Sequence, residues 1–244
     1  MSQPPTHSGA ATTQRASDSG ARVWDVGVRM GHWGLVLAVI GSFTTHYVGD
    51  RVFWLHIWSG YVVLTLVISR TVWGVVGTRY ARFAQFVRGP RAVWASRLEL
   101  FPRHHHPMAG HTPVGGWVIV LMLAVLGAQA ITGLFANDAV VETGPLMGYV
   151  SMRLSNRLSQ WHEWLSFLIL ALVTVHVLAA FYYRWVLRDD VITPLITGKK
   201  RHVAATEGIA SAGAWGALAT LLLVASLLAW LIISAPAAPD LLMG

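Results

Sequence analysis

The segment WHEWLSFLILALVTVHVLAAFYY, residues 161–183, is strongly apolar and is interrupted by two histidines. A helix of about 20 such residues spans the roughly 30 Å hydrocarbon core of a bilayer. His162 and His176 are 14 residues apart. At about 100° and 1.5 Å per residue they share nearly the same helix face and lie roughly 21 Å apart along the axis. The segment therefore predicts a membrane-spanning helix that presents two imidazoles near opposite membrane surfaces.

The composition indicates an all-α integral membrane protein. The chain is 55% hydrophobic and 12% charged, and it has 12 tryptophans among 244 residues and a mean hydropathy of +0.53. Soluble domains carry about twice as many charged residues. An ionisable side chain inside a spanning helix is costly and normally faces a partner in the interior of a bundle. Each histidine of the opening segment therefore needs a partner on another span.

Four further apolar segments bring the predicted number of spans to five. The first is short, but residues 26–30 are able to extend it. His32 stands at the beginning of the first span and His56 in the first turn of the second. The five predicted spans are about 31–47, 53–76, 114–136, 161–183 and 210–233.

The chain divides into four predicted parts. Residues 1–22 are small and polar, which predicts a disordered cytoplasmic tail, and they lack the apolar run and cleavage site of a signal peptide. Residues 23–190 are expected to form a four-helix transmembrane core. Residues 191–209 are a cytoplasmic connection, and residues 210–244 hold a fifth, C-terminal transmembrane helix and the C-terminus.

The distribution of basic residues predicts the orientation. Fifteen Lys and Arg residues fall in the tail and in the second and fourth connections, against three on the other side. Short loops rich in Lys and Arg stay in the cytoplasm, so the N-terminus is expected inside and the C-terminus outside. The same asymmetry accounts for the net charge of +7 without a nucleic-acid partner, because anionic lipid headgroups face these residues.

Membrane depth then pairs the histidines. His32 begins a span that leaves the cytoplasm, so it lies level with His176, which comes late in a helix that runs inward. His56 and His162 both begin spans at the outer face. Two histidine pairs at two depths in one bundle are what two six-coordinate haems require, because each iron takes one axial nitrogen from each of two facing helices. The predicted ligands are His32 with His176 for an inner haem and His56 with His162 for an outer haem.

Glycines and arginines near these histidines allow two interpretations. Gly60 lies one turn beyond His56, and the glycines of the spans serve either close helix packing or the approach of a flat macrocycle. Arg29 lies one turn before His32, and Arg70 lies 14 residues after His56 on the same face. Each arginine either pairs with a haem propionate or anchors the span end. The other glycines in question are Gly34, Gly41, Gly127 and Gly133.

Several motifs give the chain a resemblance to a known family. Together with the four histidines, they look like those of the bacterial cytochrome b-561 family, whose superfamily includes the b-type cytochrome subunit of nickel-iron hydrogenase. The resemblance covers about residues 23–188. The motifs are Arg29 with His32 and Trp33, His56 with Gly60 and Tyr61, Arg70 with Trp73 and Gly74, GHTPVGG at 110–116, and TGLF at 132–135.

The resemblance implies a four-helix core with two b-type haems in the bacterial inner membrane, and electron exchange between the quinone pool and another redox carrier. The expected partners are membrane lipid, a quinone or quinol as substrate, and a redox protein such as a c-type cytochrome, a dehydrogenase or a hydrogenase. Whether the chain is itself a quinol/quinone oxidoreductase or only an electron-transfer subunit stays open. The direction of electron flow and a homodimer also stay open.

The cytoplasmic histidines are a second candidate group. His104, His105 and His106 have no carboxylates or cysteines at ligand spacing, which favours a solvated loop over a metal site. His111 lies in the motif at the membrane edge, where it is placed to hydrogen-bond a quinone or a haem propionate. With Arg70 it makes the cytoplasmic side our expected quinone site.

The rival quinone site is the outer end of the bundle. His46 is expected to be an interface residue there. Glu163 adjoins His162 and is either a proton acceptor for quinol chemistry or a solvated carboxylate at a helix start, where the helix dipole favours it.

Some chemistries are excluded and one alternative function remains. The chain has no cysteine, so any haem is non-covalent and no iron–sulfur cluster is bound through thiolates. No glycine-rich nucleotide motif follows a strand, because no strands are predicted. The alternative is a transporter or channel whose buried histidines conduct protons or metal ions. We find neither an internal repeat nor broken helices, which such transporters usually show.

Overall fold

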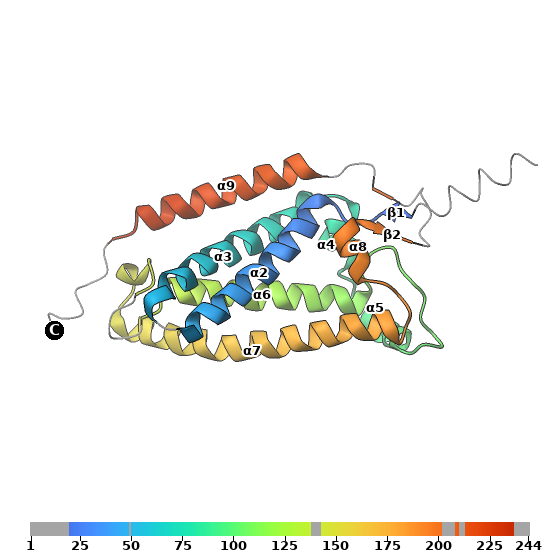
Figure 1. Ribbon diagram of the computed structural model, residues 1–244, viewed down its shortest axis with the longest axis horizontal. Helices are drawn as coiled ribbons and strands as arrows, with labels where there is room; N and C mark the ends of the chain where they lie inside the picture. Colours follow the sequence, from blue (N-terminus) through green and yellow to red (C-terminus); the bar gives the residue numbers. More distant parts are fainter. Residues whose placement is uncertain (1–19, 49, 138–142, 202–207, 210–212, 237–244) are drawn as a thin grey trace, which may run out of the picture.

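The computed structural model describes residues 20–48, 50–137, 143–201, 208–209 and 213–236. It is almost entirely helical, with five helices long and apolar enough to cross a membrane (Figure 1). These are α2, α3, α6, α7 and α9. In chain order the elements are β1 Ala21–Arg22, α2 Val26–Val48, α3 Phe53–Val76, α4 Phe83–Phe86, α5 Pro90–Ser96, α6 Pro113–Leu134, α7 Met152–Trp185, α8 Ile192–Thr197, β2 Lys199–Lys200 and α9 Ala214–Ile233.

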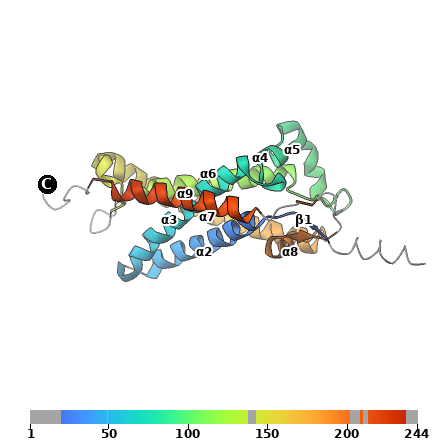
Figure 2. The same cartoon turned by 90° about the horizontal axis from the view of Figure 1, so that it is seen from above.

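The long helices form a four-helix bundle with a fifth helix on one side, as the sequence predicts. α2 packs on α3, α6 packs on α7, and α3 joins the two pairs through α6. α9 lies along α3 and α2, on the side of the bundle away from α7 (Figure 1). Seen from above, the pair α2 and α3 crosses the other helices at an angle (Figure 2). Large apolar side chains cover the outer surfaces of all five helices, as lipid contact requires.

The helix starts are fixed by side chains that satisfy free backbone N–H groups. The buried carboxylate of Asp25 accepts a hydrogen bond from the Val28 N–H at 2.8 Å, before α2. Thr112 accepts one from Gly115 at 3.1 Å, and Pro113 fits the first position of α6 because its missing N–H costs nothing there. These caps explain why α2 and α6 begin at those residues.

The start of α7 corrects the sequence prediction. The predicted span begins at residue 161, whereas the helix begins at Met152, nine residues earlier. The buried Ser155 donates to the Phe135 carbonyl at 2.7 Å, and Ser159 donates to the Asn137 carbonyl at 2.9 Å. These bonds hold two polar turns of α7 against the end of α6.

The longer helix also rules out one interpretation of Glu163, namely that it stands at a helix start. Glu163 lies beyond the third turn of α7, so its carboxylate is too far from the helix start to be stabilised by the helix dipole. The other predicted bounds differ little. α3 has the predicted bounds, α2 begins at Val26, α6 ends at Leu134, and α9 begins at Ala214.

A short β-ladder is the second correction, because the sequence predicts no strands. Ala21 pairs with Lys200 and Arg22 with Lys199 in an antiparallel sheet of two strands. The last two residues of the predicted disordered tail are therefore ordered, and Ala21 is buried. Residues 1–19 of that tail and residues 202–207 of the predicted connection lie outside the described residues.

Tryptophans mark the two ends of the bundle. Ten tryptophans expose at least a third of their surface, and they fall into two groups of five. Such amphipathic rings favour the two membrane–water interfaces. One group lies on the side of α4, α5, α8 and the strands, and the other at the opposite ends of the helices (Figure 1). The groups are Trp33, Trp94, Trp117, Trp185 and Trp215, and Trp54, Trp58, Trp161, Trp164 and Trp230.

α9 packs on the bundle through small residues. A Cβ atom built on Gly27 of α2 would lie 2.4 Å from the Ala217 Cβ of α9, and one on Gly216 would lie 2.9 Å from the Trp73 ring. Trp73 in turn donates its Nε1–H to Asp25 at 3.0 Å. The N-terminal turn of α9 therefore packs directly on the cluster that starts α2.

Candidate functional site

The structure brings the inner histidines together from α2 and α7. The ring centroids of His32 and His176 are 6.3 Å apart, with an angle of 46° between the ring planes. Trp33 packs edge-on against His32 at 5.2 Å. The Nδ1 of His32 is shielded from solvent and has no hydrogen-bond partner among the described residues.

The outer histidines meet in the same way, from α3 and α7. The ring centroids of His56 and His162 are 6.1 Å apart, and the ring planes are inclined by 79°. Phe53 stacks on His56 at 5.3 Å. His46 also reaches this group, with its ring centroid 5.8 Å from that of His56, although its side chain is exposed. This end of the bundle therefore holds three imidazoles.

Backbone carbonyls of neighbouring helices fix the orientation of the outer rings. The Nδ1 of His56 lies 3.0 Å from the Ser42 carbonyl, and the Nδ1 of His162 lies 2.9 Å from the Gln129 carbonyl. A carbonyl only accepts, so each Nδ1 carries the proton and each Nε2 keeps a lone pair. Ring orientation by the second nitrogen is the usual arrangement of metal-binding histidines.

Gln129 also contacts the nitrogen that remains free to bind a metal. Its side-chain Nε2 lies 3.1 Å from the Nε2 of His162 and donates to its lone pair. Its Oε1 is buried without a hydrogen-bond partner among the described residues. A metal on His162 would take the place of this amide.

The five candidate glycines separate into different roles. A Cβ on Gly41 or Gly60 would meet nothing within 4 Å, so these positions leave open space beside the outer histidines. A Cβ on Gly34 or Gly127 would contact Leu66 at 3.1 Å or Val67 at 3.6 Å, which is helix packing. A Cβ on Gly133 would lie 2.8 Å from His162, so the absence of a side chain there makes room for the ligand ring itself.

The two arginines each have a nitrogen without a hydrogen-bond partner among the described residues, at the end of the bundle that the sequence predicts to be cytoplasmic. The Nε of Arg29 and the Nη1 of Arg70 are both shielded from solvent and lack a partner among the described residues. The Arg70 guanidinium carbon lies 5.3 Å from the centre of the Phe83 ring. Buried donors without a partner are costly, so these groups suit an anionic or carbonyl ligand.

His111 lies between two aromatic rings on the same side. Its ring centroid is 4.5 Å from that of Trp24 and 4.6 Å from that of Phe86. Burial, together with the positive charges of Arg70 and Lys200, lowers the pKa of His111 to about 3. The imidazole is therefore neutral at pH 7, and its shielded Nδ1 lacks a partner among the described residues.

The histidine-rich connection is only partly the solvated loop that the sequence favours. The His105 side chain is 3% exposed, and its Nε2 lies 3.3 Å from Asp189. Lys200 forms an ion pair with the same carboxylate at 2.8 Å and donates to the Met108 carbonyl at 2.9 Å. His105 therefore joins the second connection to the segment after α7, while His104 and His106 are exposed.

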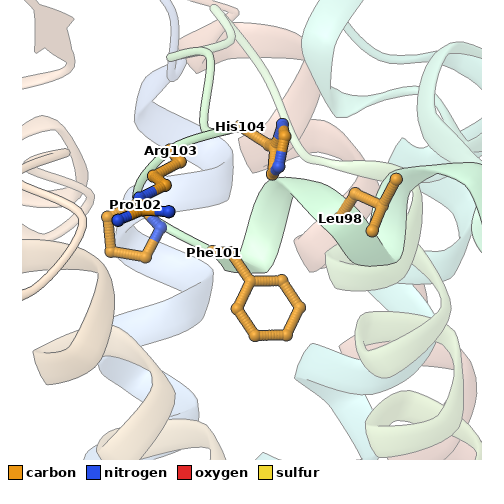
Figure 3. A pocket seen from close by; sticks show the side chains of 5 residues that line it. All are labelled: Leu98, Phe101, Pro102, Arg103 and His104. Carbon is orange, nitrogen blue, oxygen red and sulfur yellow. The ribbon is translucent and has the colours of Figure 1, made fainter.

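A surface cavity lies on this connection. It has a volume of about 460 Å³ and is formed by one stretch of chain, with apolar and basic side chains on its wall (Figure 3). None of the four paired histidines lines it, so it is separate from the histidine sites. Its lining residues are Leu98, Phe101, Pro102, Arg103 and His104.

The separation within each histidine pair is one at which both imidazoles could bind the same metal ion. A metal–imidazole bond of about 2.0 Å, plus about 1 Å from the nitrogen to the ring centre, places the two centroids about 6 Å apart. Both measured separations match this value. The open positions at Gly41 and Gly60 and the unpaired arginine nitrogens add room for a flat group and donors for acidic substituents. These residues fit a haem at each pair.

Comparison with protein families gives a match over most of the chain. The model of the prokaryotic cytochrome b561 family matches residues 23–198. The chain belongs to this family. The cytochrome b561 assignment makes the protein a multi-pass bacterial membrane protein that binds haem b and takes part in electron transfer. The family match ends before α9.

Two further comparisons gave no match. No curated protein matches this cytochrome b561 chain, and no solved structure does. The sequence predicts which histidines lie together and names Gly133 among the candidate glycines, whereas it does not predict the carbonyl acceptors at Ser42 and Gln129. Ser42 and Gln129 are each followed three residues later by a threonine, Thr45 and Thr132.

Proposed function

We propose that the protein is a di-haem cytochrome that carries electrons between the quinone pool and another redox carrier. His32 and His176 would hold an inner haem, and His56 and His162 would hold an outer haem. The observation that carries the proposal is the spacing of the two pairs, 6.3 and 6.1 Å between ring centroids, on helices that face each other.

Each group of residues has a defined task in this proposal. The haems, when bound, supply one-electron exchange between ferrous and ferric iron. The imidazoles would bind the iron, and the Ser42 and Gln129 carbonyls keep the outer rings in the correct tautomer. Arg29 would bind an acidic propionate of the inner haem. The apolar helices exclude water from both sites.

The number of haems and their ligands are tested by removing one histidine at a time. We expect the pyridine haemochrome assay to give two haems per wild-type chain. His32→Ala and His176→Ala should each leave one haem with the same residual spectrum, because both remove a ligand of the inner iron. His56→Ala and His162→Ala should each leave the other haem.

His46→Ala is the matched control for this experiment. His46 lies 5.8 Å from His56 but is exposed, and it is not assigned as a ligand. The variant should retain two haems. One haem in the wild type, or two haems in any of the four ligand variants, would contradict the assignment.

The quinone site belongs to the cytoplasmic side in this proposal. His111 and Arg70 each have a shielded nitrogen without a hydrogen-bond partner among the described residues, and a quinone carbonyl accepts from such donors. A soluble or membrane partner would then exchange electrons with the outer haem from the opposite face. The rival site, at His46 and Glu163 beside the outer pair, has side chains that are exposed.

The family assignment favours this function over a histidine-lined transporter. The visible spectrum of the purified protein separates the two, because a low-spin b-type haem gives sharp bands that change on reduction. A colourless preparation that folds normally would support the transporter.

A further inference from the structure

The connection between α3 and α6 exposes large apolar side chains although it is not part of a membrane span. Trp94, Leu98 and Phe101 are 69%, 49% and 58% exposed. They belong to α5 and the helical turn that follows it, at a spacing of four and three residues that places them on one side. Exposed apolar patches of this kind mark contacts with a membrane or another partner.

Two hydrogen bonds tie this segment to the ends of spanning helices. The indole of Trp117, in the second turn of α6, donates to the Arg88 carbonyl at 2.9 Å. The hydroxyl of Tyr182, in the last turn of α7, donates to the Leu100 carbonyl at 2.7 Å. Trp and Tyr side chains favour the membrane–water interface. The apolar side chains of the segment therefore lie level with this interface.

The same segment is rich in positive charge. Arg97 lies over the Trp94 ring, with its guanidinium carbon 3.9 Å from the ring centre, and it donates to the Trp94 carbonyl at 2.7 Å. Residues 88–106 contain a single carboxylate, that of Glu99, which is partly buried. Cations beside apolar groups at an interface attract anionic lipids. The four arginines of this stretch, all exposed, are Arg88, Arg91, Arg97 and Arg103.

The cavity on this segment combines the two properties. Its volume of about 460 Å³ lies within the range of roughly 300–1,000 Å³ that is usual for small-molecule sites. Leu98, Phe101 and Pro102 give it an apolar wall, and Arg103 and His104 supply hydrogen-bond donors. Figure 3 shows the Arg103 side chain on one side of the view and Leu98 on the other, with the Phe101 ring between them.

We propose that this cavity is a binding site for an anionic phospholipid. The phosphate accepts hydrogen bonds from Arg103 and His104, and the beginning of the acyl chains lies against Leu98 and Phe101. A zwitterionic lipid offers the same chains and phosphate but adds a cation, which the arginines repel. An acidic protein surface would match the arginines but not the apolar wall. The site is independent of the number of haems and of the quinone site.

Native mass spectrometry of the full-length, haem-loaded protein tests the selectivity. The protein is mixed in detergent with equimolar phosphatidylglycerol, which is anionic, and phosphatidylcholine, which is zwitterionic. We expect phosphatidylglycerol to be retained about fivefold over phosphatidylcholine, which corresponds to the contribution of about 1 kcal/mol from one arginine beside anionic lipid.

Two variants separate the charged part of the site from the apolar part. Arg103→Gln should remove the preference for phosphatidylglycerol while leaving the retention of phosphatidylcholine unchanged, because only the guanidinium distinguishes the two headgroups. Phe101→Ala should lower the retention of both lipids by the same factor. Both side chains are exposed, so both variants should fold and keep the wild-type haem content.

Matched controls lie elsewhere on the bundle. Arg157 is an exposed arginine near the start of α7, and Phe167 is 57% exposed on the same helix, close to the value of Phe101. Arg157→Gln and Phe167→Ala should leave the retention of both lipids at the wild-type level. A loss in these variants as large as in Arg103→Gln and Phe101→Ala would overturn the proposal.

Three other results would also overturn it. Equal retention of the two lipids by the wild type would show that the cavity does not select an anionic headgroup. Displacement of phosphatidylglycerol by millimolar inorganic phosphate would show a site for a small anion that makes no use of the acyl chains. Displacement by a polyglutamate peptide would show a surface for an acidic protein.

Discussion

At the scale of single residues, His111 and Arg70 each have a buried nitrogen without a hydrogen-bond partner among the described residues. Leaving a buried donor unpaired costs about 1–3 kcal/mol. His111 is also neutral at pH 7, because burial and the charges of Arg70 and Lys200 lower its pKa to about 3. A neutral imidazole donates from one nitrogen and accepts at the other, which suits the exchange of a proton with a quinol.

Quinol reduction of the haems tests the role of these residues. His111→Ala should slow reduction by a short-chain quinol analogue by about 100- to 10,000-fold, as removal of a positioned acid–base group typically does. Stopped-flow absorbance at the haem bands measures the rate. Haem content should stay at the wild-type value. Arg70→Ala should act in the same direction.

Glu163→Gln is the matched variant at the opposite end. Its carboxylate is exposed beside the outer pair, and its replacement should leave the rate of quinol reduction unchanged. Loss of quinol reduction in Glu163→Gln, with normal rates in His111→Ala, would place the site at the outer face.

The residue scale also shows which site features the sequence is able to reveal. The pairing of His32 with His176 and of His56 with His162 follows from helix period and membrane depth, which are properties of each span alone. The acceptors at Ser42 and Gln129 depend on how neighbouring helices are rotated about their axes when packed. Helix rotation is set by side-chain packing across the interface, so a single span does not encode it.

At the scale of elements, α9 depends on a contact without room for an added methyl group. A Cβ on Gly27 would lie 2.4 Å from the Cβ of Ala217, and both atoms are fixed to helix backbones. Neither is able to move away by a side-chain rotation. α2 and α9 therefore approach each other as closely as they do because residue 27 is glycine.

Gly27→Ala should therefore separate the two helices and lower stability. Overpacking of this kind costs about 1–3 kcal/mol, which lowers the unfolding temperature by roughly 2–12 °C in a chain of this size. Thermal unfolding followed by circular dichroism in detergent measures the change. The double variant Gly27→Ala with Ala217→Gly should recover most of the loss, because the opposing methyl group is gone.

Gly31→Ala is the control on the same helix. A Cβ there meets nothing within 4 Å, and alanine favours the helix by about 0.5–1 kcal/mol over glycine. This variant should be as stable as the wild type or more stable. An equal loss of stability in both variants would show that close packing of α9 on Gly27 does not determine the stability.

The helices as elements were largely predictable, and their ends were less so. Five spans follow from apolar length alone, and the predicted bounds of α3 are those of the structure. The early start of α7 is different, because its first turns are polar and are held by Ser155 and Ser159 against the end of α6. The strand formed by Ala21 and Arg22 likewise depends on residues almost 180 positions away.

At the scale of the whole molecule, the basic connections gather at one end of the bundle. α4 and α5, which follow α3, and α8 and β2, which follow α7, lie there together with β1, whereas α9 finishes at the opposite end (Figure 1). The tryptophans at both ends are exposed, as interfacial residues are. Lys and Arg are retained on the cytoplasmic side during insertion, so this end is expected inside.

Reporter fusions test the orientation. Alkaline phosphatase fused after Gly244 should be active, because this enzyme folds only outside the cytoplasm, and a fluorescent protein fused there should be dark. Fusions after Lys200 should give the opposite results. An active fluorescent protein at Gly244, with the same result at Lys200, would mean that α9 does not cross the membrane.

α7 carries one member of each proposed histidine pair on a single helix of 34 residues. α2 and α3 carry the other members, and they leave the ribosome first. A nascent chain that ends before Met152 therefore contains only one histidine of each proposed pair and lacks the second haem ligand at both sites. Cofactor capture has to await synthesis of α7, and both sites become complete during the insertion of that one helix. Chains interrupted upstream of α7 should accumulate without haem and be open to quality-control proteolysis.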